Sequence, residues 1–489
     1  MAPYPAASVH WPFPLTALEH GSFVFAGLLI YVLVTRAAQQ HRHPSAAIAW
    51  VMIIGLFPYI GIPLFLLFGS RKFVRPGHKP PISASINASE EAPVWAMESL
   101  NAMDIPPPTH NSSIVFHKDG IESREALVSL IEGAQRSIDL CTFILRADVI
   151  GAAVVDSLIG RARQGVRVRV LLDAIGSMQI SRRQIASLRQ AGVVVRWFMP
   201  VLHNPLRGRL NLRNHRKLLV IDDAYLWSGG RNLAAEYFID IGEFPAWVDL
   251  SFVVHGALAM QAKMVFDLDW HAASGKRREA HRKALSHEPP DVFFAQSHQS
   301  PGALESTELT NSACAQLVPS GPDHADDTVY ALLLAAAYHA RHRIMAVTPY
   351  FVPDEALLAA WCMACRRGVQ LTLVLPKRSN HRLADLARER ALRALVDAGA
   401  QVYLSPAMIH AKAVVIDGEL ALCGSVNLDG RSLFLNFELM TAFYSPTQIE
   451  WLATWTEQQV LRSSAYQASP PSWGRDVVEG VVRAVGFQL

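Results

Sequence analysis

Hydrophobic and polar residues follow two alternating patterns over most of the chain. From about residue 114, short apolar runs that are typical of buried strands alternate with longer segments whose apolar residues recur at helical spacing. Strands and helices that alternate in this way predict an α/β fold. A length of 489 residues is too great for one compact core, so we expect two or three structural units.

The N-terminal part of the chain is more apolar than the rest. Residues 46–68 contain no charged side chain, and a helix of that length is long enough to cross a bilayer of about 30 Å. A second apolar stretch, residues 21–35, lies upstream and is short for a complete span. We expect residues 1–72 to form a membrane anchor, a transmembrane helical hairpin in which Pro58 and Pro63 kink the second helix. A re-entrant or interfacial segment is the alternative.

Basic residues flank the expected hairpin unevenly. Lysine and arginine are enriched in loops on the cytoplasmic side of a membrane, and more of them follow the second apolar stretch than separate the two stretches. The imbalance predicts a multi-pass anchor with the body of the chain in the cytoplasm, and the same basic cluster suits contact with anionic headgroups. The basic residues after the second stretch are Arg71, Lys72, Arg75 and Lys79, and those in the loop are Arg36 and Arg42.

The strongest organisational signal is an internal repeat. The first half contains GAQRSIDLCTFI, RARQGVRVRVLL, LRQAGVVVRWF, HRKLLVID and SGGRN, and the second half contains HARHRIMAVTPYF, CRRGVQLTLVLP, LVDAGAQVYLS, HAKAVVID and CGSVN in the same order. Each half thus carries H-x-K-x4-D followed by G-x-x-N. One such motif is a weak signal, but two copies with matched downstream loops predict a duplicated unit. The motif residues are His215, Lys217, Asp222 and Asn232 in the first half and His410, Lys412, Asp417 and Asn427 in the second.

The repeat and the composition together give the expected boundaries. A Pro- and Ser-rich stretch, residues 73–113, is typical of a linker, with one short helix expected at about 95–103. The C-terminal residues 466–489 carry apolar positions at helical spacing and suit either the membrane surface or the body of the protein. The two halves are expected at 114–271 and 313–465, joined by residues 272–312.

Charge and cysteine content limit the partners and cofactors. Lysine and arginine number 45 against 42 acidic residues, without a basic tail, so broad nucleic-acid binding is not predicted. Five scattered cysteines do not make a disulfide framework and fit a reducing compartment. Cys362 and Cys365 form a single C-x-x-C on one helical face, for which packing is favoured over zinc binding. The carboxylates form no cluster along the sequence, so we expect no metal site.

The repeated polar residues suit a phosphodiester substrate. Side chains two positions apart share one face of a strand, so each motif histidine stands beside its lysine. The glycine-containing turns after the next strand let backbone amides and an asparagine approach an anion closely. If the two halves pack about a pseudo-twofold axis, two imidazoles and two ammonium groups surround one pocket. One imidazole then attacks phosphorus and the other protonates the departing alkoxide, without a metal.

A histidine nucleophile also needs an acceptor that orients its other ring nitrogen. Two acids downstream of the motifs are candidates. Asp249 lies 34 residues after His215, and Glu438 lies 28 residues after His410. Each acid stands in an apolar, strand-like segment, where a carboxylate is costly unless it is paired. The alternative is that either acid faces solvent from an edge strand.

The motifs identify a resemblance to a known family. The segments LLDAIGS, LNLRNHRKLLVIDD, VPSGPD, TPYFVPDEAL, HAKAVVIDG and GSVNLDGRSLFLNFE resemble those of the phospholipase D superfamily, and most closely those of bacterial cardiolipin synthases. The similarity extends from about residue 20 and includes the apolar N-terminal segment. It implies two pseudo-twofold-related lobes, each a mixed sheet flanked by helices, behind a membrane anchor in the bacterial inner membrane.

The resemblance also implies a reaction and its partners. It implies the transfer of a phosphatidyl group between two phosphatidylglycerol molecules, which gives cardiolipin and glycerol through a phosphatidyl-histidine, with no cofactor. By analogy with the superfamily, His215 is the nucleophile and His410 the acid and base. The expected partners are phosphatidylglycerol and an anionic membrane. A phospholipase D hydrolase or another headgroup transferase, including one that uses phosphatidylethanolamine as acceptor, remains an alternative.

The remaining roles follow from the same resemblance. Asp249 and Glu438 are expected to orient the imidazoles, whereas Asp222 and Asp417 are expected to stabilise strand and loop more than to touch substrate. Gly230 stands where Ser425 stands in the other half, so the pocket should be electrostatically asymmetric. The expected phosphate-binding residues are Lys217, Lys412, Asn232, Asn427 and Ser425.

Four further residues carry weaker signals. Arg213 is a candidate for a lipid phosphate, whereas Arg216 points to the opposite strand face and is expected to make a structural contact. Tyr350 and Phe351 precede an expected helix and suit either an acyl-chain entrance or the core.

Overall fold

The computed structural model describes residues 17–37, 44–69, 72, 91–200, 211–274, 313–475 and 479–480. The chain divides into two compact units, each described by itself below. The N-terminal unit comprises residues 1–70 and 204–211, and the main unit comprises residues 71–203 and 212–489.

The N-terminal unit consists of three apolar helices, α1 (Ala17–Ala37), α2 (Pro44–Leu56) and α3 (Pro58–Phe68). They pack around a small core of Trp50, Ile54 and Phe65. The expected continuous helix over residues 46–68 is replaced by α2 and α3, of 13 and 11 residues. The break falls at Phe57, whose backbone is not helical. Proline lacks an N–H and fits the first turn of a helix, so Pro58 begins a new one.

A membrane-spanning helix is not found within the described residues, because none of the helices there combines the required length and apolarity. The expected hairpin therefore stands as a proposal, and it is taken up below.

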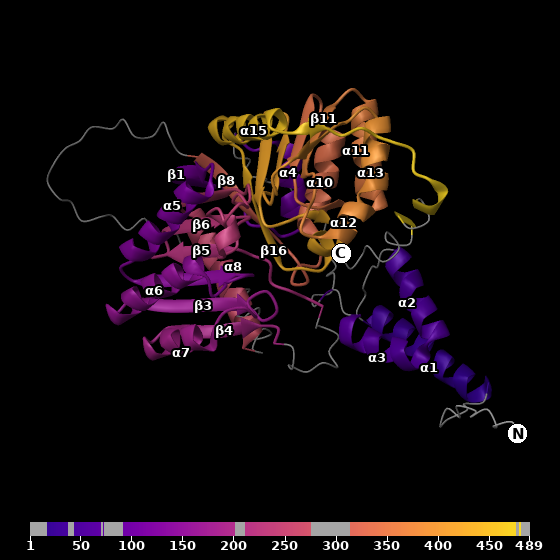
Figure 1. The fold of residues 1–489 in the computed structure, drawn as a ribbon, viewed down its shortest axis with the longest axis horizontal. Helices are drawn as coiled ribbons and strands as arrows, with labels where there is room; N and C mark the ends of the chain where they lie inside the picture. Colours follow the sequence, from indigo (N-terminus) through magenta and orange to yellow (C-terminus); the bar gives the residue numbers. More distant parts are fainter. Residues whose placement is uncertain are drawn as a thin grey trace, which may run out of the picture. The chain divides into compact units, whose positions relative to one another are not determined.

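The main unit is built on one mixed sheet of 15 strands (Figure 1). The order of strands across the sheet is β17-β12-β11-β9-β13-β14-β16-β8-β1-β7-β6-β5-β2-β3-β4. The first-half strands are β1 (Thr109–His117), β2 (Ser137–Thr142), β3 (Arg167–Asp173), β4 (Val194–Phe198), β5 (Leu218–Ile221), β6 (Tyr225–Gly229) and β7 (Ser251–Gly256). The second-half strands are β8 (Ala313–Ser320), β9 (Arg343–Val347), β11 (Gln370–Pro376), β12 (Gln401–Ser405), β13 (Ala413–Ile416), β14 (Leu420–Gly424), β16 (Glu438–Phe443) and β17 (Ser464–Ala465).

The strand order confirms the internal repeat. Outward from the centre, the first half runs β1-β7-β6-β5-β2-β3-β4 and the second half runs β8-β16-β14-β13-β9-β11-β12, so equivalent strands occupy equivalent places. The antiparallel pair β1 and β8 joins the two halves at the centre. In each half three neighbouring strands pair in parallel, β2-β3-β4 and β9-β11-β12, and the strands nearer the centre pair antiparallel. Strand β17 adds an antiparallel edge to the second half. A short parallel pair, β10 (Phe351–Val352) and β15 (Leu428–Asp429), lies apart from this sheet.

Helices cover both faces of the sheet, because the strands carry apolar side chains on both faces. In each half one group of helices packs on one face, as the group α10, α11 and α13 shows in Figure 1. On the other face, α8 (Leu258–Ala273) and α15 (Pro446–Leu461) share a single core that includes strand residues from both halves. The first group is α5 (Gly120–Gly133), α6 (Val149–Arg163) and α7 (Arg182–Gln190) in the first half, and α4 (Val94–Ala102), α10 (Thr328–His339), α11 (Glu355–Arg366) and α13 (Glu389–Asp397) in the second.

The expected boundaries can be compared with these elements. Helix α4 lies where the sequence predicts a short helix in the linker, but β1 already begins at Thr109, before the expected start of the first half. Most of the connection, residues 275–312, lies outside the described residues, as do residues 476–478 and 481–489 of the predicted C-terminal helix.

The C-x-x-C pair lies on α11. Cys362 and Cys365 are half-buried and pack against the second-half core. The Cys362 thiol lies 3.6 Å from the carbonyl oxygen of Ala394, and burial raises the pKa of Cys365 to about 11. Both thiols are therefore part of the packing of this helix.

Candidate active site

Each motif histidine is placed by a short backbone pairing between the two halves. Ahead of β5, Asn214 pairs in parallel with Phe437, and ahead of β13, Ile409 pairs in parallel with Val248. The His215 N–H donates to the carbonyl of Phe437 at 2.8 Å. Phe437 directly precedes Glu438, so His215 is placed beside the acid of the opposite half.

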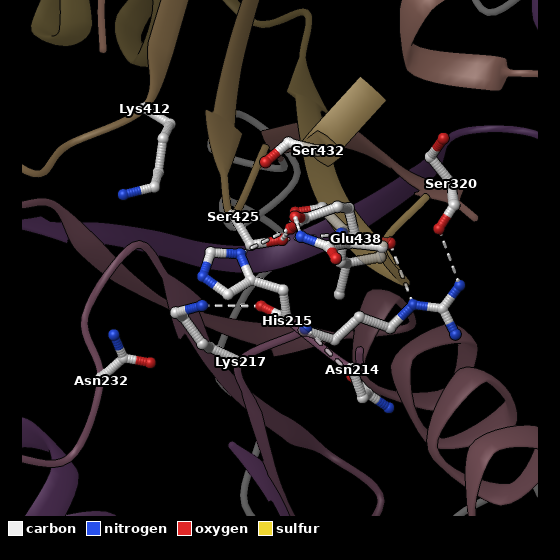
Figure 2. Close-up of polar contacts among 12 residues, drawn as sticks. Asn214, His215, Lys217, Asn232, Ser320, Lys412, Ser425, Ser432 and Glu438 are labelled. Atoms are coloured by element: carbon white, nitrogen blue, oxygen red, sulfur yellow. Dashed lines mark hydrogen bonds and ion pairs between the residues drawn. The ribbon is translucent and has the colours of Figure 1, made fainter. Parts of the chain in front are cut away.

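The second histidine repeats this arrangement. The His410 N–H donates to the carbonyl of Val248 at 2.7 Å, and Val248 directly precedes Asp249. The Nδ1 atom of His410 lies 2.7 Å from Oδ2 of Asp249. The Nδ1 atom of His215 lies 3.0 Å from Oε2 of Glu438, and Figure 2 shows these two side chains together. The two acids found in the sequence thus contact histidines, and each contacts the histidine of the opposite half.

Electrostatics keeps these imidazoles neutral and these carboxylates ionised near neutral pH. Burial lowers the pKa of His215, and burial together with the neighbouring Lys412 ammonium lowers the pKa of His410 to about 3. Burial opposes ionisation of Asp249 and Glu438, but the partner histidines and nearby lysines outweigh it and lower the pKa of both acids. A neutral imidazole that donates Nδ1–H to a carboxylate keeps a lone pair on Nε2, the atom that a nucleophile needs.

The motif lysines lie behind the histidines. The Lys217 ammonium donates to the backbone carbonyl of His215 at 2.7 Å (Figure 2). The Lys412 ammonium donates to the backbone carbonyl of His410, and its Nζ lies 2.9 Å from Nδ1 and 3.1 Å from Nε2 of that ring. Burial lowers the pKa of Lys217 to about 7 and that of Lys412 to about 8. Each lysine nitrogen thus lies beside its histidine, and burial makes the charge of each lysine easier to lose near neutral pH than in water.

The motif aspartates support the backbone, as expected. Asp222 and Asp417 both adopt left-handed backbone conformations, with φ values of 53° and 50°. Each carboxylate accepts three consecutive backbone N–H groups where the neighbouring strand begins, β2 for the first and β9 for the second, at distances of 2.7 to 2.9 Å. The donors are Gln135, Arg136 and Ser137 for Asp222, and Arg341, His342 and Arg343 for Asp417.

Ser425 and Gly230 occupy equivalent positions with different consequences. The Ser425 hydroxyl donates to Oε2 of Glu438 and accepts the N–H of Leu439 at 2.9 Å. It therefore supports the acid behind His215, and does not line the pocket as the expected phosphate ligand would. At Gly230 an added Cβ would lie 2.2 Å from Oδ1 of Asp249, so that carboxylate fills the space a side chain would need.

Both imidazoles line one pocket of about 370 Å³, lined also by Asn232 and Asn427. The edge of Phe143 packs against the His215 ring and the edge of Tyr237 packs against the His410 ring, each with ring centroids 4.9 Å apart. The pocket expected from the repeat therefore exists, and both histidines open into it.

The sequence did not lead us to predict several of the residues that line the pocket. Asp429, Arg431 and Asn436 line the pocket, together with the aromatic residues Phe143 and Tyr237. The first three stand in GSVNLDGRSLFLNFE, which lies directly after the second motif. Their position in that segment was the available signal.

The weaker candidates separate into pocket and structural residues. Arg213 is buried and contacts Asp173 at 3.5 Å and the carbonyl of Met199, so the expected contact with a lipid phosphate is corrected to a structural one. Tyr350 lines the pocket, whereas Phe351 is buried in the second-half core.

Arg216 has the structural role that its strand position predicts. Its buried guanidinium pairs with Asp269 at 2.8 Å and Asp323 at 3.1 Å, and donates to the carbonyl of Glu438 at 2.9 Å. It thus helps to fix the acid that contacts His215.

Comparison with known proteins agrees with this geometry. A family model described as cardiolipin synthase, PLD-like domain, matches residues 127–270 and 333–460, and a model described as phospholipase D-nuclease N-terminal matches residues 24–70. The cardiolipin synthase of Geobacillus kaustophilus is 30% identical over 449 residues, which cover 88% of this chain and 84% of that relative.

A second relative supports the same placement, and one solved structure shares the fold. Cardiolipin synthase A of Escherichia coli is 30% identical over 438 residues, which cover 85% of this chain and 86% of that relative. The crystal structure of phosphatidylserine synthase from Haemophilus influenzae aligns with a TM-score of 0.61 at 14% identity, over 81% of this chain and 100% of that one. This last similarity concerns the fold alone.

Proposed function

The chain belongs to the family of the cardiolipin synthase PLD-like domain, and on that premise we propose that it is a phosphatidyltransferase that makes cardiolipin. The observation that carries the proposal is the single pocket lined by His215 and His410, each bonded at Nδ1 to an acid of the opposite half. The proposed donor and acceptor are two molecules of phosphatidylglycerol.

In the first step, Nε2 of His215 attacks the phosphorus of the donor. A P–N bond forms, the bond from phosphorus to the glycerol oxygen breaks, and His410 gives its proton to the departing oxygen. His410 acquires that proton when the phosphodiester enters, because a nearby anion raises the pKa of an imidazole. Glycerol leaves, and the phosphatidyl group stays on the histidine.

In the second step, a headgroup hydroxyl of another phosphatidylglycerol attacks the same phosphorus. His410, now neutral, takes the hydroxyl proton, the new P–O bond forms and the P–N bond breaks. The products are cardiolipin and the free enzyme with His410 protonated, as at the start of the first step.

Charge around the pocket supports both steps. The buried Lys217 and Lys412 ammonium groups stabilise negative charge on the phosphorus-bound oxygens in a site of low dielectric. Glu438 and Asp249 stabilise the imidazolium form of their partner histidines, and a hydrogen bond to a charged group contributes about 1.5–3 kcal/mol. No metal or cofactor enters these steps.

We further propose that the N-terminal unit contacts a lipid bilayer. Large apolar side chains of its helices are exposed to solvent: Phe25 is 71% exposed, Leu56 61% and Ile60 60%. Apolar surface of this kind is unfavourable in water and marks a membrane or protein contact. With the basic residues that follow the second apolar stretch on the cytoplasmic side, the body would face the cytoplasm at the inner membrane. Anchoring there would hold the pocket beside its lipid substrates.

The proposal is tested with the purified full chain and labelled phosphatidylglycerol in detergent that contains a chelator. We expect labelled cardiolipin together with released glycerol. Phosphatidic acid as the only product would identify a phospholipase D hydrolase instead. A product that requires a different added alcohol would identify another headgroup transferase.

A further inference from the structure

The two halves build different walls of the shared pocket. Equivalent residues of the two motif segments lie 195 positions apart, as His215 and His410 do. Where the first half has Ala234 and Tyr237, the second half therefore has Asp429 and Ser432. The residue two positions before the acid is Trp247 in the first half and Asn436 in the second. The segment after the first motif thus presents Tyr237 to the pocket, where the segment after the second motif presents the polar residues Asp429, Ser432 and Asn436.

The polar wall presents hydrogen-bond acceptors. The side chain of Asn427 bonds to the carboxylate of Asp429, and Nδ2 of Asn436 donates to Oε1 of Glu438 at 3.1 Å. A carboxylate only accepts, so the NH2 group of each amide must face it and the amide oxygen must face away. Both oxygens, Oδ1 of Asn427 and Oδ1 of Asn436, are buried without a hydrogen-bond partner among the residues that the structure describes.

Asn232, the first-half equivalent of Asn427, is not fixed in this way. Its amide lies 2.8 Å from the hydroxyl of Tyr237, and a hydroxyl either donates or accepts. Asn232 can therefore turn either its NH2 group or its oxygen toward a ligand, and that oxygen too is buried without a partner among the described residues. The amides of Asn427 and Asn436 are held by one N–H on a carboxylate, which fixes the direction of the unpaired oxygen and leaves each NH2 group its second N–H. The two asparagines that the repeat makes equivalent therefore differ in how firmly their amides are oriented.

Asp429 adds a third acceptor to the same wall. Its carboxylate is buried and accepts the N–H of Ser432 at 2.7 Å, which leaves further acceptor capacity on its oxygens. Burial raises its pKa to about 6, so the group is mostly ionised at neutral pH. A phosphate has no hydrogen to donate to such a wall, but a hydroxyl group has one.

We infer that Asn427, Asp429 and Asn436 form a subsite that binds the hydroxyl groups of the glycerol headgroup and favours this alcohol over water as acceptor. The inference rests on the proposed function and deepens it, because it assigns residues to the choice of acceptor.

The test compares transfer with hydrolysis in Asp429→Asn. The amide oxygen of asparagine still accepts the N–H of Ser432, so the helix cap remains, while the charge and one acceptor are lost. The matched control is Asp354→Asn, because Asp354 caps α11 through the N–H of Leu357 at 3.0 Å and does not line the pocket. Phosphatidylglycerol vesicles are the substrate, and the ratio of cardiolipin to phosphatidic acid is measured beside the thermal midpoint.

We expect the ratio of cardiolipin to phosphatidic acid to fall at least about tenfold in Asp429→Asn, the scale of one hydrogen bond to a charged group. In Asp354→Asn the ratio should equal that of the wild type. A folded Asp429→Asn protein with an unchanged ratio would overturn the inference while leaving the synthase proposal intact. A wild type that makes no cardiolipin would instead overturn the proposed function.

A second measurement needs no variant and covers the case in which Asp429→Asn does not fold. Wild-type enzyme is given cardiolipin together with glycerol, 1-propanol or ethanolamine, and the phosphatidyl-alcohol formed is measured against alcohol concentration. Glycerol should reach half-saturation at a concentration at least about tenfold lower than 1-propanol, which lacks the further hydroxyls. Equal half-saturation by glycerol and 1-propanol would overturn the subsite.

Discussion

Replacement of Glu438 by glutamine should disable the site without removing any bulk. Three donors meet this carboxylate: Nδ1–H of His215 and the hydroxyl of Ser425 at Oε2, and the NH2 group of Asn436 at Oε1. Glutamine offers one oxygen and one NH2 group. If its NH2 takes the Oε1 position, it faces the NH2 of Asn436. If it takes the Oε2 position, it faces Nδ1–H of His215.

The size of the effect follows from these contacts. Loss of one hydrogen bond to a charged group costs about 1.5–3 kcal/mol, or roughly 10–150-fold in rate. Where the amide donates to His215, the ring must carry its proton on Nε2, and that nitrogen cannot attack phosphorus. A comparable acid-to-amide change in a Ser-His-Asp triad lowers kcat about 10⁴-fold. We therefore expect kcat to fall between about 10²-fold and 10⁴-fold.

The assay is the initial rate of cardiolipin formation from phosphatidylglycerol over a range of substrate concentrations. The loss should lie in kcat with little change in KM, because the acid acts through the histidine and not on the lipid. Glu419→Gln is the matched control, since Glu419 is an exposed acid of the same half that accepts a hydrogen bond from the indole N–H of Trp95 at 3.4 Å and does not line the pocket. If folded Glu438→Gln keeps more than about a tenth of the wild-type kcat, the assigned role of this acid is wrong.

Three further predictions concern other parts of the site. Gly230→Ala should lower both the activity and the thermal midpoint, because the added Cβ would displace Asp249. Gly160→Ala is the control and should preserve both, because the space around its Cβ is open. A folded Gly230→Ala protein with wild-type activity would contradict this. Loss of the Lys217 and Lys412 charges, whose pKa values burial lowers to about 7 and about 8, should reduce kcat as pH rises through that range. The free energy of unfolding, measured with denaturant, should meanwhile increase as pH rises to the unfolded lysine pKa of about 10.4, because the unfolded chain binds more protons than the folded one over this range. A fall of the free energy of unfolding together with kcat would contradict this. Quenching early in the reaction with alkaline detergent, which preserves a P–N bond, should leave the phosphatidyl group on His215. Mass spectrometry of peptides at alkaline pH identifies the labelled residue, and a label on the other motif histidine would reverse the proposed order of the two.

The sequence predicts the duplication and the shared pocket because the same motifs occur in the same order in both halves. Each half keeps the same order of strands, so the equivalence of His215 and His410 could be found by comparing the chain with itself. The acids Asp249 and Glu438 were found from their apolar surroundings. The spacing could not predict which acid contacts which histidine. Each acid contacts the histidine of the opposite half because of backbone pairings between distant segments.

Other features depend on local geometry that no pattern of residue types reports. Ser425 and Asn427 match an expected phosphate site by type, yet their hydrogen bonds to Glu438 and Asp429 give them different roles. In the N-terminal unit, hydropathy alone predicts one helix over residues 46–68. The non-helical backbone at Phe57 divides that stretch into two.

The most direct test of the paired-histidine site is the separate replacement of His215 and His410 by alanine in the full chain, with cardiolipin formation measured for each variant. Since one imidazole must form the bond to phosphorus while the other moves the proton, each folded variant should lose essentially all turnover. Substantial cardiolipin formation by either variant would contradict a single pocket that works through both rings.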